Sequence, residues 1–321
     1  MKFEPWMIVV AAVAAPLLLM FLFDLKKSRP DGTFVENLHK YRTMMFYVMP
    51  TRNESVVYFD EYVDAENLVA YAREAETAFG TDVDITHCVV AGCAFGFVEN
   101  PNMNQFVMGY RLYARDGVWL SFSMKRKKLD KSAKLSVVKQ LVRPEMTFRQ
   151  FCEEINEKIG VERSGKKTYA DREYDMFTLI PRPLLHRLVK VFRQFDYWNL
   201  LPGSFITNDP MYTSMFIANL GSLKMGAGFH HLYEWGTCPL FLMVGQIEDR
   251  PVVRDGEVVV RPILHLRFSY DERVDDGLTA GQGIRTLKEV LENPREALGC
   301  LDANGEDAWS LGTPRDQRSA A

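Results

Sequence analysis

The sequence lacks the features that mark several common protein classes. Its five cysteines (Cys88, Cys93, Cys152, Cys238 and Cys300) are an odd number, widely spaced and without a CxxC pair. We therefore expect buried thiols rather than a disulfide framework or a zinc site. Neither a glycine-rich phosphate loop nor a metal-ligand spacing occurs in the 321 residues. No bound metal and no bound cofactor are expected.

An excess of charge of one sign is also lacking. The net charge is −3, with 47% hydrophobic and 25% charged residues, which is typical of a globular protein. Nucleic-acid binding usually requires a basic excess, so nucleic acid is not an expected partner. A local basic cluster, residues 125–134, is typical of a solvated strand end or loop. A contact for the phosphates of a nucleotide-tailed cofactor or for anionic lipid is the alternative.

A long apolar run is present at the amino terminus, from Trp6 to Phe23. Its length is about the minimum that spans a bilayer core as a helix. A cleaved signal peptide is the alternative, although no small-residue cleavage site follows the run. Residues 26–29 carry three basic side chains, against Lys2 before the run. The positive-inside rule then predicts a single-pass protein of the cell membrane, with its body on the cytoplasmic side.

Hydrophobic periodicity predicts helices alternating with strands in the remainder of the chain. Helices are expected over residues 65–79, 87–100, 147–160, 176–201 and 277–294. Strands are expected over residues 56–64, 105–116, 117–127, 211–221, 238–249 and 257–272.

Three details of this reading are specific. The helix over residues 87–100 is apolar on every side and should be buried, and the wide apolar stripe of residues 176–201 predicts helices that pack into the core. Asp116-Gly117 and Asp255-Gly256 predict hairpin turns. The sequence thus divides into an anchor over residues 1–29, an α/β domain over residues 30–300, and a disordered tail over residues 301–321.

Four blocks in the last third follow one another with a specific order and spacing. They are ANLGSL (218–223), VGQIEDRPVVRDGEVVVRP (244–262), LRFSYDERVDDG (266–277) and LKEVLENP (287–294). This pattern resembles the catalytic domain of the dihydrolipoyl acyltransferases, the E2 components of 2-oxoacid dehydrogenase complexes. These belong to the chloramphenicol acetyltransferase-like superfamily. The resemblance covers roughly residues 35–298.

The resemblance implies a two-layer α/β sandwich with a large mixed sheet flanked by helices, preceded here by one transmembrane helix. It also implies a homotrimer with an active-site channel along each subunit interface. One side of the channel carries a DHRxxDG motif, whose histidine removes the proton from a thiol of coenzyme A or dihydrolipoamide. The other side carries a serine or threonine in a TISNLG-like strand, whose hydroxyl stabilises the oxyanion.

This chain departs from the family at both chemical positions. Glu272 stands where the first motif has its histidine, and Ala218 occupies the hydroxyl position of the second. The matching residues are Asp271, Arg273, Asp276, Gly277, Asn219, Leu220 and Gly221. A general base contributes ~10²–10⁴-fold and an oxyanion donor ~10²–10³-fold, so losing both would be costly. Ala218, Asn219 and Arg273 are the candidates for substrate binding. A structural ion pair between Glu272 and Arg273 is the alternative.

A replacement base is available in FHHLYEWGTCP, residues 229–239. If this segment is helical, His230 and Glu234 share a face, and the carboxylate could orient the imidazole as in a catalytic relay. The prediction is a base at His230 or His231, across the channel from Glu272 and Asp276. Adjacent histidines at a buried turn or interface are the structural alternative. The pairing of this segment with DER in place of DHR resembles a divergent subgroup of the family.

The sequence therefore predicts a membrane-anchored E2-like acyltransferase that moves an acyl group between coenzyme A and an unknown acceptor. A coenzyme A thioester would be its co-substrate, with no bound cofactor. The alternative function is a catalytically degenerate trimeric scaffold or an acyl-CoA-binding protein.

Overall fold

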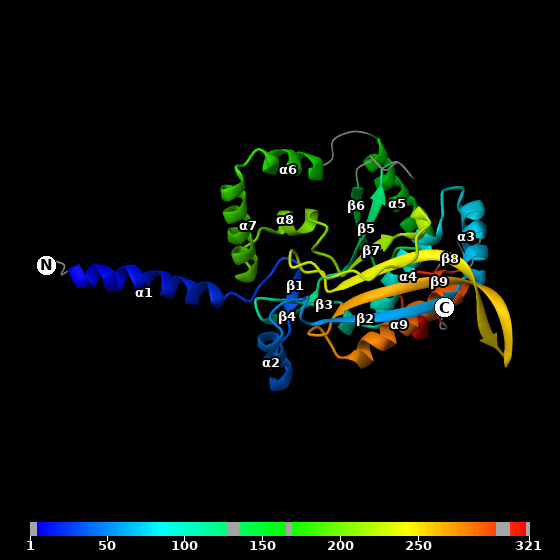
Figure 1. Cartoon of the computed structure of the whole chain (residues 1–321), viewed down its shortest axis with the longest axis horizontal. Coiled ribbons are helices and arrows are strands. Elements are labelled where there is room, and N and C mark those ends of the chain that lie inside the picture. Colours follow the sequence, from blue (N-terminus) through cyan, green and yellow to red (C-terminus); the bar gives the residue numbers. More distant parts are fainter. Residues whose placement is uncertain (1–4, 127–134, 165–168, 300–308, 319–321) are drawn as a thin grey trace.

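The structure is a computed structural model that describes residues 5–126, 135–164, 169–299 and 309–318. Its centre is a six-stranded sheet (Figure 1). In spatial order the strands are β2 (Val56–Asp64), β9 (Glu257–Asp271), β8 (Leu240–Arg254), β7 (Met215–Asn219), β5 (Val118–Lys125) and β6 (Leu135–Val142). Strand β7 runs parallel to β8 and β5, whereas the other neighbours are antiparallel. The sheet is therefore mixed, as expected.

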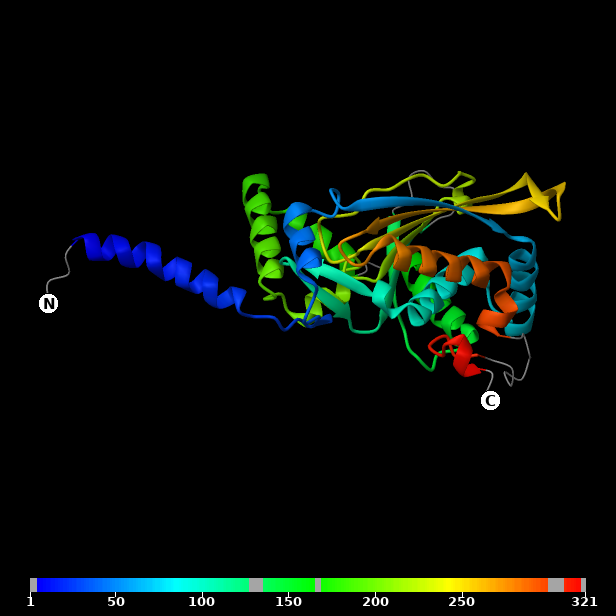
Figure 2. The same ribbon diagram turned by 90° about the horizontal axis from the view of Figure 1, so that it is seen from below.

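Helices cover one face of this sheet and form the second layer (Figure 2). The main ones are α3 (Glu66–Phe79), α4 (Ile85–Glu99), α5 (Phe148–Arg163) and α9 (Gly277–Glu292). Helix α4 packs against α3, α5, α9 and β5, which explains why it is apolar on every side. Asp84 caps its first turn by accepting from two backbone N–H groups. The buried helix and the large mixed sheet flanked by helices are confirmed.

The remaining elements are short or lie at the ends of the body. A second sheet contains β1 (Gly32–Phe34), β4 (Arg111–Arg115) and β3 (Gln105–Met108). The other helices are α1 (Pro5–Asp24), α2 (Lys40–Val48), η1 (Pro101–Met103), α6 (Tyr169–Thr178), α7 (Arg182–Tyr197), α8 (Gly203–Asn208), η2 (Gly221–Leu223), α10 (Pro294–Leu298) and α11 (Arg315–Arg318).

One of the two predicted hairpins is wrong. The strands on either side of Asp116-Gly117, β4 and β5, belong to different sheets. The tight hairpin instead joins β3 to β4 at Gly109-Tyr110, where both φ angles are positive (58° and 57°), as a type I′ turn requires. The hairpin at Asp255-Gly256 is confirmed, because it joins β8 to β9.

The apolar run at the amino terminus forms α1, which projects from the body (Figures 1 and 2). Those of its side chains that the structure describes are exposed, except Phe23, whose ring contacts Trp198. Over the part of the chain that the structure describes, however, no helix is both long and apolar enough to cross a membrane. The predicted transmembrane helix is therefore not supported.

Helix α7 corrects the expectation for residues 176–201. It lies at the end of the body from which α1 projects (Figure 2), and Asp196 is its one fully buried residue. Leu184 and Val191 of the predicted core stripe are 58% and 46% exposed. The stripe is real, but the core does not cover all of it.

Several predicted boundaries also change. Residues 309–318 were expected in a disordered tail, yet Leu311 is fully buried and its N–H donates to the carbonyl of Met146. Helix α5 continues past the expected end at Gly160 to Arg163. Most of the basic cluster at residues 125–134, and Cys300, lie outside the described residues. The other four cysteines are buried free thiols, as predicted.

Candidate functional site

The sheet face opposite the helices carries the position of the missing hydroxyl. Along β7, Met215 and Ile217 point toward the helical layer, while Phe216 and Ala218 point to the other face. Residues 224–239 cross this second face between η2 and β8. Phe216 and Ala218 belong to a small apolar cluster beneath this segment, together with Phe241, Met243 and Leu232.

The expected helix over residues 229–239 is absent, and the segment is irregular. Two of its backbone groups bond to residues outside the segment. The Ser269 hydroxyl donates to the carbonyl of His230, and the N–H of Thr237 donates to the carbonyl of Met211. The segment forms no helix, so the expectation that His230 and Glu234 share a helical face is wrong.

His230 is nevertheless held in a defined tautomer. Its ring stacks on Phe241 at 4.1 Å between centroids, and its Nδ1 lies 2.6 Å from the carbonyl oxygen of His231. A carbonyl only accepts, so Nδ1 carries the proton and Nε2 keeps its lone pair. Burial lowers the pKa of His230, against the opposing effect of this hydrogen bond. The neutral imidazole can therefore accept a proton at Nε2 near neutral pH.

His231 differs from His230 mainly in exposure. Its Nδ1 lies 2.9 Å from the carbonyl oxygen of Leu232, so it has the same tautomer, but its side chain is exposed. It stacks on His230 at 4.7 Å. Of the two candidates, the partly buried and stacked His230 is better suited to act as a general base than the exposed His231.

Glu234 does not orient either histidine. Its carboxylate accepts from the backbone N–H of Arg52 at 3.3 Å and from that of Asn53 at 3.0 Å. It also accepts from the side-chain amide of Asn53 at 2.8 Å. Glu234, the predicted relay partner, therefore stabilises the turn before β2, whereas the carbonyl of His231 orients the imidazole of His230.

The turn after β9 is built around a buried ion pair. Arg273 donates from Nε and Nη2 to the two oxygens of Asp271, each at 2.8 Å, and both side chains are almost fully enclosed. Asp271 also accepts from the Ser55 hydroxyl at 2.8 Å. The alternative pair between Glu272 and Arg273 is therefore wrong, and the guanidinium of Arg273 is occupied.

Two further candidates also have structural roles. Asp276 is the N-cap of α9, and its carboxylate accepts from the backbone N–H groups of Leu278 and Thr279. Asn219 points toward α4, where its amide donates to the Thr86 hydroxyl at 2.8 Å. Neither side chain is directed at a substrate in this arrangement.

Glu272 is the exception among these motif residues. Its backbone N–H donates to the carbonyl of Ser55 at 3.0 Å, so the residue is fixed in place. Its half-buried carboxylate has no hydrogen bond or ion pair with any residue that the structure describes. Residue 272, where the E2 motif has its histidine, therefore has a fixed backbone, and its carboxylate has no partner among the described residues.

The two motifs lie far apart within one chain. Ala218 pairs with Met243 of β8, Met243 pairs with Arg267 of β9, and Glu272 follows five residues later. Two strand spacings of ~4.8 Å and five residues of ~3.4 Å give a separation of roughly 20 Å. Ala218 and Glu272 of one chain are therefore too far apart to contact the same reacting atom.

Ser123 is a candidate that the sequence did not indicate. It lies on β5, directly opposite Ala218 in the register, and is half-buried. Its hydroxyl makes no hydrogen bond within the described residues. Paired residues of neighbouring strands lie ~5 Å apart, so this hydroxyl is next to the position where the family has its own. Only the register between β5 and β7 could have revealed it.

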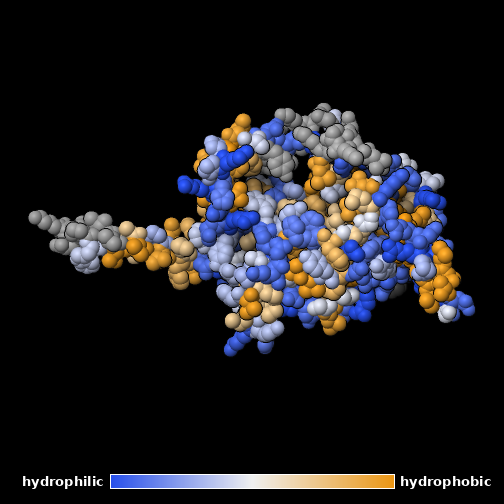
Figure 3. Space-filling model, viewed as in Figure 1, coloured by the Kyte–Doolittle hydropathy of each residue, from blue (hydrophilic) through white to orange (hydrophobic). Residues whose placement is uncertain are grey.

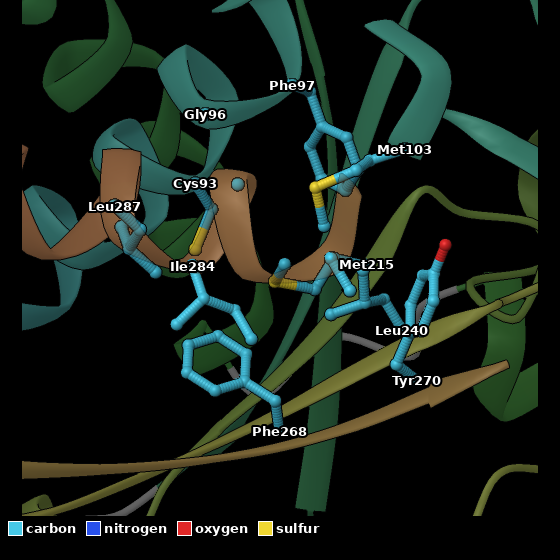
Figure 4. A pocket seen from close by; sticks show the side chains of 12 residues that line it. Cys93, Gly96, Phe97, Met103, Met215, Leu240, Phe268, Tyr270, Ile284 and Leu287 are labelled. Atoms are coloured by element: carbon cyan, nitrogen blue, oxygen red, sulfur yellow. The ribbon is translucent and has the colours of Figure 1, made fainter. Parts of the chain in front are cut away.

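A small apolar pocket of the core is a separate feature (Figure 4). It has a volume of about 20 Å³ and lies between α4, α9 and the sheet, with Cys93, Phe97, Ile284 and Phe268 in its wall. Burial raises the pKa of the Cys93 thiol, so the group is not a nucleophile. The pocket lies on the helical side of the sheet, opposite the face that carries Ala218.

Comparison with known proteins finds similarity in the last third of the chain. Residues 208–299 match the model of the 2-oxoacid dehydrogenases acyltransferase (catalytic domain) family. The succinyltransferase component of the 2-oxoglutarate dehydrogenase complex of Cupriavidus necator is 46% identical over 57 residues. The acetyltransferase component of the pyruvate dehydrogenase complex of Bacillus subtilis is 41% identical over 57 residues. These matches cover 18% of this chain and 13–14% of the relatives.

The fold extends the likeness over most of the chain. A probable dihydrolipoamide acetyltransferase from Listeria monocytogenes covers 81% of this chain and 95% of its own, with 19% identity and a TM-score of 0.54. A chloramphenicol acetyltransferase covers 81% and 99%, with 11% identity and a TM-score of 0.50. The resemblance is therefore confirmed: residues 208–299 carry the sequence pattern of the 2-oxoacid dehydrogenase acyltransferase catalytic domain, on the chloramphenicol acetyltransferase-like fold.

Proposed function

We propose that the protein is an E2-like acyltransferase that works as a homotrimer and transfers an acyl group between coenzyme A and a second nucleophile. The observation that most supports this proposal is the tautomer of His230, which leaves Nε2 free to accept a proton. His230 lies on the same sheet face as Ala218, the position where the E2 motif has its oxyanion-stabilising hydroxyl. The coenzyme A thioester is a co-substrate in this proposal. The acceptor remains open.

The proposed reaction uses three side chains. His230 Nε2 removes the proton from the attacking thiol, whose sulfur then adds to the acyl carbonyl and forms a tetrahedral oxyanion. The Ser123 hydroxyl donates to that oxygen, in place of the hydroxyl missing at Ala218. The intermediate collapses by breaking the bond to the departing thiolate, which takes the proton from His230. Glu272 of a neighbouring subunit faces the imidazolium and stabilises its charge.

Acyl transfer from a panel of acyl-CoA thioesters, with dihydrolipoamide and other thiols as acceptors, tests the proposal. His230→Ala should lower kcat/KM by ~10²–10⁴-fold and Ser123→Ala by ~10²–10³-fold. His231→Ala is the matched control, since this exposed neighbour has the same tautomer, and it should retain most of the rate. Equal loss in both histidine variants, or no loss in either, would show that His230 is not the base.

A catalytically degenerate trimeric scaffold is the second candidate. It is favoured by the structural roles of Asp271, Arg273 and Asp276, because these residues preserve the turn without serving any chemistry. The scaffold would bind acyl-CoA in the same channel without turnover. Saturable binding of coenzyme A, measured by calorimetry, together with no acyl transfer above background would establish it.

The place of action is a separate part of the proposal. We place the protein at the cell membrane with its body on the cytoplasmic side. The basic residues at 26–29 and the four buried free thiols support this, as do the exposed apolar side chains of α1. Recovery of the full chain in the soluble fraction of lysed cells would contradict it, whereas membrane sedimentation with an accessible body on the cytoplasmic side is expected.

A further inference from the structure

Helix α7 has an outer face that the body leaves uncovered. Its inner side is fixed by Phe192, whose ring packs on Phe205 at 5.5 Å, and by Asp196, which accepts from the Tyr212 hydroxyl at 2.9 Å. Leu184, Val191 and Phe195 lie on the outer side, spaced by seven and four residues, and all three are exposed. They form a continuous apolar stripe.

A cation borders this stripe. Arg187 follows Leu184 by three residues and precedes Val191 by four, which places it alongside them on the helix surface. Lys190 lies further round the helix from the stripe, and Arg193 lies on the opposite side of the helix from it. Within the part of the chain that the structure describes, none of these three cations has an ion-pair partner. Figure 3 shows apolar and hydrophilic residues mixed at this end of the molecule.

A chain of aromatic rings links α7 to the base of α1 and to α2. Phe23 contacts Trp198 at 5.4 Å, and Tyr197 lies beside Trp198 at 6.4 Å. Tyr197 meets Tyr110 at 6.0 Å, which stacks on Tyr47 of α2 at 4.8 Å. These three helices therefore meet at one end of the body, with α1 emerging between α7 and α2 in Figure 1.

Helix α2 adds to the same exposed apolar surface. Tyr41, Met44, Tyr47 and Val48 are all more than half exposed, although Phe46 on the opposite side is buried. We call the outer faces of α7 and α2 the helical end. It combines apolar side chains, tyrosine rings and unpaired cations in one region next to the exposed apolar helix α1.

We propose that the helical end is a peripheral docking surface for a lipid bilayer with anionic head groups. Apolar stripes flanked by lysine and arginine lie in the plane of such interfaces, and tyrosine and tryptophan concentrate at the head-group level. The unpaired cations of α7 complement the negative surface of the cytoplasmic leaflet. This surface is distinct from the acyl-transfer face and does not depend on turnover.

A local fluorescent probe tests the surface in the full chain. Because α1 also exposes apolar side chains, the readout has to report on α7 itself. An environment-sensitive thiol dye is attached at Val191→Cys, or at Val258→Cys on the β8–β9 hairpin as a control, since Val258 is 72% exposed. Both chains carry Cys300→Ser, while the four remaining cysteines are buried. Vesicles of phosphatidylcholine are compared with vesicles that also contain phosphatidylglycerol.

We expect a blue shift of the dye at position 191 with the anionic vesicles and none at position 258. High salt and the combined change Arg187→Glu, Lys190→Glu and Arg193→Glu should abolish the shift, since each cation contributes about fivefold to binding an anionic surface. Acyl transfer in vesicle-free solution should be unchanged by the triple variant, so failure here is separable from failure of the proposed function. An equal shift on neutral vesicles, no shift at all, or a shift without lipid that grows with protein concentration would overturn the proposal. The last outcome would assign the surface to protein association.

Discussion

At the residue scale, the turn after β9 shows what a sequence motif preserves. Residues 271–274 form a turn that the Val274 N–H closes by donating to the Asp271 carbonyl, and within it Arg273 reaches both carboxylate oxygens of Asp271. The Glu272 side chain takes no part in this pair, so the sequence could predict a surviving turn but not the partner of Arg273. Glu234 was predicted with the wrong partner for a similar reason. Its predicted role required a helix over residues 229–239, and that helix does not form. The Glu234 carboxylate accepts from the backbone N–H of Asn53 instead.

The pH dependence of acyl transfer should report on His230. A base must be neutral, and burial lowers the pKa of His230 below its usual value of about 6.5. Activity should therefore persist at pH 6.5 and fall only as the pH drops through the lowered pKa. This acidic limb of the pH profile should be measured from kcat/KM against pH.

The Glu272→Gln variant separates the two possible origins of this limb. If His230 is the base, the variant loses rate but keeps an acidic limb. Disappearance of the limb in Glu272→Gln, with its retention in His231→Ala, would move the titrating group from the imidazole to the carboxylate.

At the element scale, prediction succeeded where all the apolar residues that define an element are buried in the fold. Helix α4 and the long hairpin of β8 and β9 were found because their apolar periods and turn residues agree. Helix α7 was located correctly but assigned to the core, since an amphipathic stripe shows that a face is apolar and not what covers it. The register that places Ser123 beside Ala218 joins strands about 95 residues apart, beyond any local signal.

The glycine of the NLG motif has a packing role that can be tested. A Cβ at Gly221 would lie 2.5 Å from the carbonyl oxygen of Gly245, a backbone atom that cannot move aside cheaply. Gly221→Ala should lower the free energy of unfolding by about 1–3 kcal/mol, measured by denaturant titration. Gly226→Ala is the matched control, since no atom lies within 4 Å of its Cβ position. Equal stability of the two variants would contradict this role.

At the scale of the whole molecule, the separation of the two motifs determines how a site can form. Ser123 and Ala218 lie at one end of the sheet face, and Glu272 lies roughly 20 Å away across two strands and along a third. A single chain therefore offers two incomplete halves. Contact between copies in a closed ring would join the half of one subunit to the other half of its neighbour.

Hybrid trimers provide a direct test of this arrangement. Ser123→Ala and Glu272→Gln should each lower acyl transfer when assembled alone. Co-expression of the two variants with different tags, followed by purification through both, should restore part of the rate, since some interfaces then combine intact Ser123 with intact Glu272. Doubly tagged trimers of one variant are the control. Hybrids no more active than either parent would confine the chemistry to one subunit.

The folded body of the protein includes Arg29, which the sequence assigned to the anchor. Arg29 follows the end of α1 by only five residues, yet its guanidinium is enclosed, with bonds to Asp31, Asp196 and Asn199. Trimming the chain to start at residue 30 would strand the Asp196 carboxylate inside without its cation, at a cost of about 3–5 kcal/mol. One enclosed guanidinium thus fixes the chain to the end of α7 five residues after the projecting helix stops.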